Sequence, residues 1–287
     1  MEITTSTKLT GLLGSPVSHS ISPKMHNEAF RLLGLDYVYL AFDVGKEDLK
    51  VAVDGLKTLG IHGFNLTMPD KTAVVPLVDE MTPASQIAGA CNTVANRNGR
   101  LIGHTTDGIG YMMSVKDAGY DIIGEKMTLL GAGGAATAIC TQAALDGVAA
   151  IDIFRRKSKN AFIRTEHFAA RAAAYTGCKI CVYDLADRTQ LKKSLLESKI
   201  LTNGTNVGMA PDLDATPLPD TSLLYPELIV SDVIYNPRET RFLAEAKAIG
   251  CPTFNGMYML LYQGAAAFEF WTGYKMPAEE IKKKYFQ

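Results

Sequence analysis

Residues 126–137 read Lys-Met-Thr-Leu-Leu-Gly-Ala-Gly-Gly-Ala-Ala-Thr, an apolar run that leads through clustered glycines into small residues. This order predicts a buried strand, a glycine loop and the first turn of a helix. Glycine lets the backbone turn sharply and lets a ligand approach the main chain, and a helix start offers free amides to a pyrophosphate. Ala136 stands where the Gly-x-Gly-x-x-Gly pattern has its third glycine, a substitution that the pattern allows. The segment predicts a dinucleotide site, with an ordinary strand-to-helix turn as the alternative.

The chain that follows this segment continues to alternate between strands and helices. Strands are expected at residues 150–154 and 179–183 with a helix at 161–175 between them, the order of a doubly wound α/β domain. About 20 residues past the glycines, NAD enzymes carry an acid. Here the chain has three cations and a serine, namely Arg155, Arg156, Lys157 and Ser158. The cations suit the 2′-phosphate of NADP, with a solvated charged loop as the alternative.

The first hundred residues show a second alternating pattern. Strands are expected at residues 9–13, 37–42 and 61–66, and the segments between them have the periodicity of helices. This predicts a β-α-β-α-β run, and therefore a second α/β domain.

The loop after the first of these strands is rich in hydroxyl groups. Ser22 followed by Pro23 predicts a helix start with Ser22 as its cap. Ser20 has no evident capping role, so the cluster indicates a site for a polyhydroxylated or anionic small molecule. His26 has no acidic residue at an orienting spacing, and a packing or surface role is expected for it.

Two further polar segments follow predicted strands. Lys71 comes after Asn65 and Thr67 in a turn stiffened by proline, and it opens a predicted helix that runs to residue 78. A lysine is disfavoured at a helix N-terminus, so its position indicates more than solvation. Asp107 ends the second segment, where it can cap the following helix and also take part in a site.

The composition is that of a globular protein, with 47% hydrophobic and 21% charged residues among 287. This length is sufficient for two domains. A net charge of −1 gives no overall field that attracts nucleic acid or an anionic membrane, so neither partner is expected. The chain lacks an apolar run of roughly 18 residues and a signal-peptide core, so a cytoplasmic location is expected.

The cysteines predict neither a disulfide framework nor a metal site. Their number, five, is odd, which agrees with a reducing compartment. Cys178 and Cys181 form a C-x-x-C spacing, but the segment alternates like a strand and places the two thiols on opposite faces.

Motifs from both halves of the chain together match a known family. The chain resembles the shikimate dehydrogenases, in particular the branch that accepts quinate as well as shikimate. The resemblance extends over nearly the whole length of the chain. The segments that carry it are Ser20-Ile21-Ser22-Pro23, Asn65-Leu66-Thr67-Met68-Pro69-Asp70-Lys71, Cys91-Asn92-Thr93, Thr106-Asp107-Gly108, Gly131-Ala132-Gly133-Gly134-Ala135, Tyr235-Asn236-Pro237 and Gln263-Gly264-Ala265.

The resemblance implies an α/β fold of two domains with the active site in the cleft between them. The N-terminal substrate-binding domain would comprise residues 1–107 and be completed by residues 256–287, and residues 108–255 would form a doubly wound Rossmann domain. The implied reaction is the reversible NADP-dependent reduction of 3-dehydroshikimate to shikimate, or of 3-dehydroquinate to quinate, with NAD as the alternative cofactor.

The resemblance also implies residue roles. Lys71 and Asp107 would form the catalytic pair, because hydride transfer to a ketone leaves charge on oxygen, which a protonated lysine stabilises and neutralises. The substrate contacts would be Ser20, Ser22, Tyr39, Thr67, Asn92, Thr106 and Gln263. The cofactor contacts would be Gly131, Ala132, Gly133, Gly134, Ala135, Arg155, Arg156, Lys157, Ser158, Asn206, Val233, Tyr235 and Gly256. No metal ligand is implied.

The sequence departs from the family pattern at two places. Arg155 and Ser158 stand where the branch that uses both cofactors has Asn and Asp, which favours NADP over NAD. Tyr258 stands where the family has glycine, so the packing of the nicotinamide against Gly256 is expected to differ.

Two other functions are alternatives: another dehydrogenase of similar build, and a catalytically silent domain that senses such metabolites. A silent sensor could dispense with Lys71 and Asp107, so the presence of both favours an enzyme. The sequence leaves open the preference between shikimate and quinate. It also leaves open the oligomeric state, with a homodimer as one alternative.

Overall fold

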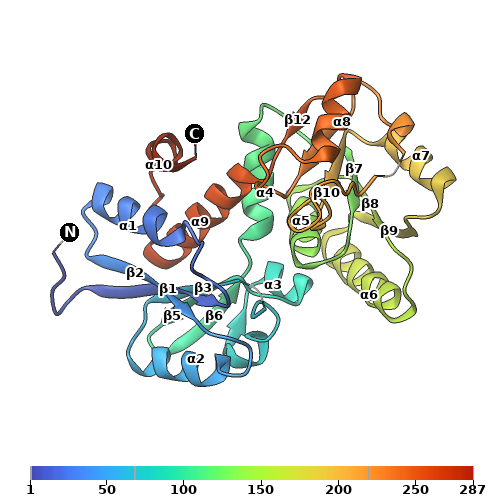
Figure 1. Cartoon of the computed structure of the whole chain (residues 1–287). Coiled ribbons are helices and arrows are strands. Elements are labelled where there is room, and N and C mark those ends of the chain that lie inside the picture. Colours follow the sequence, from blue (N-terminus) through green and yellow to red (C-terminus); the bar gives the residue numbers. More distant parts are fainter. Residues whose placement is uncertain (1, 68, 219, 287) are drawn as a thin grey trace. The chain divides into compact units, whose positions relative to one another are not determined.

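The computed structural model describes residues 2–67, 69–218 and 220–286, and these divide into two compact units (Figure 1). Unit 1 consists of Met1–Thr106 and Leu261–Gln287, and unit 2 is Asp107–Leu260. Each unit has its own sheet and its own helices, which confirms the expected two-domain α/β fold. Met68, part of the motif at residues 65–71, lies outside the described residues.

Unit 1 contains a mixed sheet in the strand order β2-β1-β3-β5-β6-β4. Its strands are β1 (Lys8–Gly14), β2 (Tyr37–Asp43), β3 (Gly63–Leu66), β4 (Glu80–Met81), β5 (Thr93–Arg97) and β6 (Arg100–His104). β1 runs parallel to β2 and β3, whereas β5 is antiparallel to β3 and β6. The predicted β-α-β-α-β run is present, because α1 (Ser22–Leu33) and α2 (Leu49–Thr58) connect the first three strands.

The start of α1 differs from the sequence prediction. Ser22 is the first helical residue, the cap position is Ile21, and no side chain caps the helix. Ser20 Oγ instead accepts a hydrogen bond from Ser22 N at 3.2 Å, so the assignment of capping to Ser22 is wrong. Pro23 stands in the first helical turn, where its fixed φ suits the helix. The helix then ends at Gly34, whose φ of 62° is left-handed.

The predicted α-helix at residues 71–78 is also wrong. Lys71 lies in a run of turns that leads into a short 3-10 helix, Val75–Leu77. Pro76 has no N–H to donate, and its ring would clash with the carbonyl four residues earlier in an α-helix. The segment can therefore form tight turns but not a continuous α-helix.

The last part of the chain completes unit 1. α3 (Pro83–Ala88) precedes β5, while α9 (Met257–Thr272) enters the unit at Leu261 and α10 (Ala278–Tyr285) follows it. Trp271 of α9 donates from Nε1 to the Val94 carbonyl at 3.0 Å. Its ring lies against Gly63, where a Cβ would collide with it. On the α2 side, the core is formed by Leu13, Leu49, Val53, Leu56, Ile61, Phe64, Leu66, Val74, Cys91, Val94 and Leu101.

Unit 2 contains a parallel sheet in the strand order β12-β11-β10-β7-β8-β9. Its strands are β7 (Lys126–Leu130), β8 (Ala150–Arg155), β9 (Lys179–Asp184), β10 (Ile200–Asn203), β11 (Ile229–Asp232) and β12 (Thr253–Phe254). Its helices are α4 (Asp107–Asp117), α5 (Gly134–Asp146), α6 (Lys159–Thr176), α7 (Arg188–Glu197) and α8 (Arg241–Ile249), with a 3-10 helix at Thr221–Leu223. Counted from β7, the strand order is that of a doubly wound dinucleotide-binding domain, as predicted.

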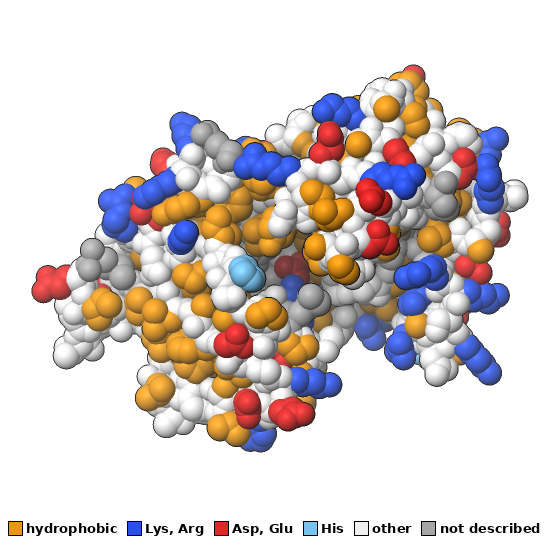
Figure 2. Space-filling model, in the orientation of Figure 1, with side chains coloured by type: hydrophobic (Ala, Val, Ile, Leu, Met, Phe, Trp, Pro, Cys, Tyr) orange, Lys and Arg blue, Asp and Glu red, His pale blue; other side chains and the backbone are white. Residues whose placement is uncertain are grey.

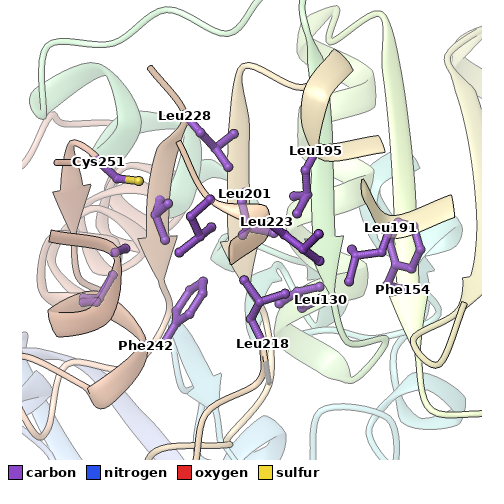
Figure 3. Close-up of a cluster of buried hydrophobic side chains, with 14 residues drawn as sticks. Leu130, Phe154, Leu191, Leu195, Leu201, Leu218, Leu223, Leu228, Phe242 and Cys251 are labelled. Atoms are coloured by element: carbon purple, nitrogen blue, oxygen red, sulfur yellow. The ribbon is translucent and has the colours of Figure 1, made fainter. Parts of the chain in front are cut away.

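The four inner strands of unit 2, β7, β8, β10 and β11, are buried on both faces. α5 and α6 contact β7, β8 and β9, and a separate apolar cluster joins the strands to α7 and α8 (Figure 3). In that cluster Leu130 and Phe154 come from the strands, and Leu191 comes from α7. Burial on both faces explains why inner strands such as β7 read as continuous apolar runs, whereas the edge strand β9 is only partly buried.

Charged side chains of both signs are interspersed on the face shown in Figure 2, in keeping with the net charge of −1. Of the helices that the structure describes, none has the length and apolar character that a bilayer span requires.

His26 lies on the buried side of α1 among aromatic rings. Its imidazole stacks on Tyr39 with ring centroids 4.4 Å apart, and the rings of Trp271 and Phe268 lie 5.2 and 6.2 Å away. Neither ring nitrogen has a hydrogen-bond partner within the described part of the chain. Burial lowers the pKa of His26 to about 3, so the ring packs as a neutral group.

We expect the His26→Phe substitution to reduce the acid sensitivity of folding. The unfolded chain protonates this histidine near its ordinary pKa of 6.5, whereas the folded chain does so only near 3. Stability is therefore lost as pH falls below 6.5, by at most about 1.4 kcal/mol per pH unit for one proton. Urea unfolding of both proteins from about pH 7 to pH 5 should show the variant gaining relative stability as pH falls. Parallel pH dependences would contradict this interpretation.

Candidate functional site

A buried hydrogen-bond network in unit 1 is centred on Asn65 of β3. Its Oδ1 accepts from the Tyr39 hydroxyl at 2.8 Å. Its Nδ2 donates to the Asn92 carbonyl at 3.1 Å and to Thr93 Oγ1 at 2.9 Å. The amide thus joins β2, β3 and the start of β5 through groups that would be costly to bury unpaired.

Asn92 extends this network to two distant parts of unit 1. Its Oδ1 accepts from Thr106 N at 2.7 Å, and its Nδ2 donates to Thr106 Oγ1 at 3.0 Å. The same Nδ2 lies 3.4 Å from Gln263 Oε1 on α9. Three predicted substrate contacts that are far apart in the sequence are therefore brought together.

The start of α1 joins the same cluster. The Ser22 side chain hydrogen-bonds to Tyr39, and Ser20 Oγ accepts from Ser22 N. Burial raises the pKa of the Tyr39 hydroxyl, so this group stays protonated and can donate to Asn65. Hydroxyl and amide groups from five elements therefore converge in unit 1, an arrangement suited to a polyhydroxylated ligand.

The turn that contains Lys71 is fixed by backbone hydrogen bonds. Thr67 N donates to the Leu13 carbonyl at 3.0 Å, and Asp70 N donates back to the Thr67 carbonyl at 2.9 Å. The Lys71 carbonyl accepts from Cys91 N at 2.8 Å, directly before Asn92 in the chain. The backbone of the predicted catalytic lysine is thereby held next to the network.

Asp107 is the first residue of α4 and is buried. It follows Thr106, whose backbone is fixed by Asn92, and precedes Gly108. A Cβ on Gly108 would collide with the Ala138 carbonyl of α5, so this helix start packs too closely for any side chain there. Asp107 is therefore the first residue of unit 2, directly after a residue anchored in unit 1 and directly before one packed on α5.

Asn65 itself was missed among the sequence-predicted contacts. It belongs to the motif at residues 65–71. The sequence feature that could have identified it needs no family resemblance: it is an amide inside the short buried strand Gly-Phe-Asn-Leu. A buried polar side chain at the end of a strand requires partners, in the core or on a ligand.

The glycine loop of unit 2 has the features of an anion site. Gly131 has a φ of 99°, which residues with side chains rarely adopt, and a Cβ there would lie 2.5 Å from Thr205 Cγ2. Gly133 is the cap position of α5 and supplies no side chain to the helix amides. A Cβ on Gly133 or Gly134 would meet open space, so a ligand can approach the first amides of α5.

The three cations after the glycine loop differ in environment. Arg155 ends β8, and its guanidinium donates to a carbonyl and to Thr165 Oγ1 of α6 at 2.8 and 2.7 Å. Arg156 and Lys157 are exposed, and Ser158 is the cap position of α6. Arg155 therefore stabilises the start of α6, while the other two cations present their charge to solvent.

The remaining predicted cofactor contacts lie in loops that follow β10, β11 and β12. Asn206 and Tyr235 are exposed, and Val233 is half-buried. Gly256 packs so closely on the Val233 carbonyl that no Cβ would fit. Because the strands are parallel, these loops and the glycine loop extend from the same edge of the sheet, where such folds bind ligands.

These features define a class of protein. Unit 2 is a doubly wound unit with a glycine loop, a helix start that no side chain caps, and two exposed cations after β8. The same chain carries an α/β unit with a cluster of hydroxyls and amides. This combination is typical of nicotinamide-dependent dehydrogenases. Residues 12–94 match the shikimate dehydrogenase substrate binding domain, and residues 256–284 match the shikimate 5'-dehydrogenase C-terminal domain. The chain belongs to the shikimate dehydrogenase family of NAD(P)-dependent oxidoreductases, which confirms the resemblance seen in the sequence.

The similarity covers the whole chain. A shikimate dehydrogenase (NADP(+)) of Listeria monocytogenes is 52% identical over 99% of this chain and 97% of its own length. The structure of shikimate 5-dehydrogenase from Listeria monocytogenes in complex with shikimate and NAD matches with a TM-score of 0.94 at 52% identity, over 99% of this chain and 98% of that one. A shikimate dehydrogenase in complex with NADP+ matches with a TM-score of 0.87 at 39% identity, over 98% and 96%.

The network makes a prediction for stability. Asn65→Leu removes both donors and the acceptor of the amide and leaves its buried partners unpaired, so we expect a loss of about 3 kcal/mol. Tyr39→Phe removes a single hydrogen bond and should cost about 1 kcal/mol. Urea unfolding measures both values, and equal losses in the two variants would show that Asn65 is not the centre of the network.

Proposed function

We propose that the chain catalyses the reversible reduction of 3-dehydroshikimate to shikimate with NADPH. The proposal is supported by the family and by relatives named shikimate dehydrogenase (NADP(+)). Quinate is the alternative substrate of the same site, since it differs from shikimate by ring saturation and one hydroxyl. A dehydrogenase of this biosynthetic reaction is expected in the cytoplasm, with small molecules as its ligands.

The observation that carries the proposal is that hydrogen bonds hold the backbone at Lys71 and at Thr106. The Lys71 carbonyl accepts from Cys91 N, and Thr106 N donates to Asn92 Oδ1, so neighbouring residues hold both segments. Asp107 follows Thr106 directly. This common anchor supports the assignment of Lys71 and Asp107 to one reacting group of the substrate.

The chemistry requires a proton as well as a hydride. NADPH supplies the hydride. Protonated Lys71 stabilises the negative charge that develops on the ketone oxygen and then donates its proton, and in the reverse reaction its neutral amine accepts the proton. Asp107 orients the lysine and shares its proton as part of a coupled pair.

The substrate groups are assigned to the network of unit 1. Ser20 and Ser22 hold the carboxylate. The ring hydroxyls are assigned to Thr67, Asn92 and Gln263, with Tyr39 and Thr106 as further contacts. Hydroxyl and amide side chains can both donate and accept, as ring hydroxyls require.

NADP fits the residues present in unit 2. The uncapped first amides of α5 suit the pyrophosphate, and the open space at Gly133 and Gly134 admits it. Arg156 and Lys157, both exposed at the end of β8, suit the 2′-phosphate. The nicotinamide end is assigned to Asn206, Val233, Tyr235 and Gly256.

We expect Lys71→Ala to lower turnover by at least about 100-fold, because the general acid is lost. The dissociation constant for NADP+ should stay within about twofold, since Lys71 belongs to the other unit. The measurements are NADPH absorbance with shikimate and a fluorescence titration with NADP+. Lys50→Ala, which removes an exposed lysine of α2, is the control and should behave like the wild type. Wild-type turnover in Lys71→Ala would refute the catalytic assignment.

We expect the double substitution Arg156→Ala, Lys157→Ala to raise KM for NADP at least about tenfold and to leave KM for NAD nearly unchanged, because NAD has no 2′-phosphate. Steady-state kinetics with both cofactors, using shikimate and quinate in turn, make the comparison. Lys159→Ala, an exposed cation at the start of α6, is the matched control. A wild-type enzyme that clearly prefers NAD would contradict the assignment.

A further inference from the structure

Asp232, the last residue of β11, has a buried carboxylate that is 1% exposed. Its Oδ1 accepts from Asn203 Nδ2 at 3.0 Å and from Ile234 N at 2.9 Å. Its Oδ2 accepts from Thr240 Oγ1, at the cap of α8, at 2.8 Å. One carboxylate therefore joins the end of β10, the loop after β11 and the start of α8.

Asn203 extends this contact toward the glycine loop. Asn203 and Asp232 are direct partners in the register of β10 and β11. Asn203 Oδ1 accepts from Thr205 N at 3.0 Å and from Thr205 Oγ1 at 2.7 Å. The Thr205 methyl group in turn packs on Gly131. The loop after β10 is thereby fixed against the glycine loop.

Ile234 extends the contact toward α9. Its carbonyl accepts from Gly256 N at 3.0 Å, and the Gly256 backbone packs on the Val233 carbonyl. Asp232 holds Ile234 N on the other side of the same residue. The loop after β11 is thereby fixed against the start of α9.

A carboxylate at this position is unfavourable for folding by itself. Burial raises the pKa of Asp232 to about 6, although Asn203, Ile234 and Thr240 all donate to it. Burying a carboxylate costs free energy that hydrogen bonds from neutral donors only partly offset. The free energy of folding therefore does not explain why an aspartate stands here. The placement of the loops after β10 and β11 does explain it.

We propose that Asp232 is a positioning residue for the nicotinamide half of the cofactor. It acts through Asn203 and Ile234, which fix the loops that contain Asn206 and Val233. This inference rests on the proposed function, because it takes NADP as the ligand of unit 2.

The test compares Asp232→Leu with a matched variant, Asp152→Leu. Asp152 is also a buried aspartate of the same sheet, 4% exposed, and it pairs with Lys126 at 2.6 Å and Ser194 at 2.5 Å. It contacts neither cofactor loop, so its removal reports the general cost of losing a buried carboxylate. Thermal unfolding establishes that each variant is folded at the assay temperature, and Ser194→Ala replaces Asp152→Leu as the control should the latter not fold.

The first readout is ligand affinity, measured by titration calorimetry. Asp232→Leu should weaken NADP+ binding at least about tenfold, while adenosine 2′,5′-bisphosphate, which lacks the nicotinamide, should bind within about twofold of the wild type. Asp232→Asn should stay within about threefold for NADP+, because its amide can accept from Asn203 and donate to Thr240. Equal losses for both ligands, or equal losses in Asp152→Leu, would overturn the proposal.

The second readout is amide hydrogen exchange without any ligand. Exchange at residues 204–207 and 233–236 should accelerate in Asp232→Leu and remain unchanged in Asp152→Leu. Unchanged exchange in both variants would overturn the positioning role. Because no ligand is present, this result is independent of the reaction: a wild-type protein that failed to oxidise shikimate would contradict the proposed function but not the exchange result.

Discussion

The side-chain amide of Asn92 is the contact on which the arrangement of unit 1 depends. It binds both the backbone and the hydroxyl of Thr106, and it reaches Gln263 on α9. An amide offers donors and an acceptor in one plane, so a single residue can hold both kinds of partner. Two residues further along the chain from Thr106, Gly108 packs closely on α5. Asp107 lies between these two constraints, at the boundary of the two units.

Much of the fold could be predicted because its signals are local. Residues 126–137 show the strand, the glycines and the small residues of a helix start in one stretch, and the structure has β7, the loop and α5 there. Helix ends could be predicted equally well, because a glycine marks them in the sequence: Gly34 and Gly250 both adopt left-handed conformations at the ends of α1 and α8. The positions of the cations after β8 also followed from counting residues.

The rest could not be predicted because it depends on distant partners or on competition between local rules. The Asn92–Gln263 contact joins residues 171 positions apart. Arg155 looks like Arg156 in the sequence, yet its guanidinium is bound to α6. The turns around Lys71 have a helix-like composition, but Pro76 removes the hydrogen bond that a continuous helix needs.

The discontinuity of unit 1 has a consequence for synthesis on the ribosome. The N-terminal part of this unit emerges before unit 2, but Trp271, which binds the Val94 carbonyl and covers Gly63, emerges after it. All of unit 2 is translated in between. The N-terminal sheet therefore lacks the cover of Trp271 until after the whole of unit 2 has been translated.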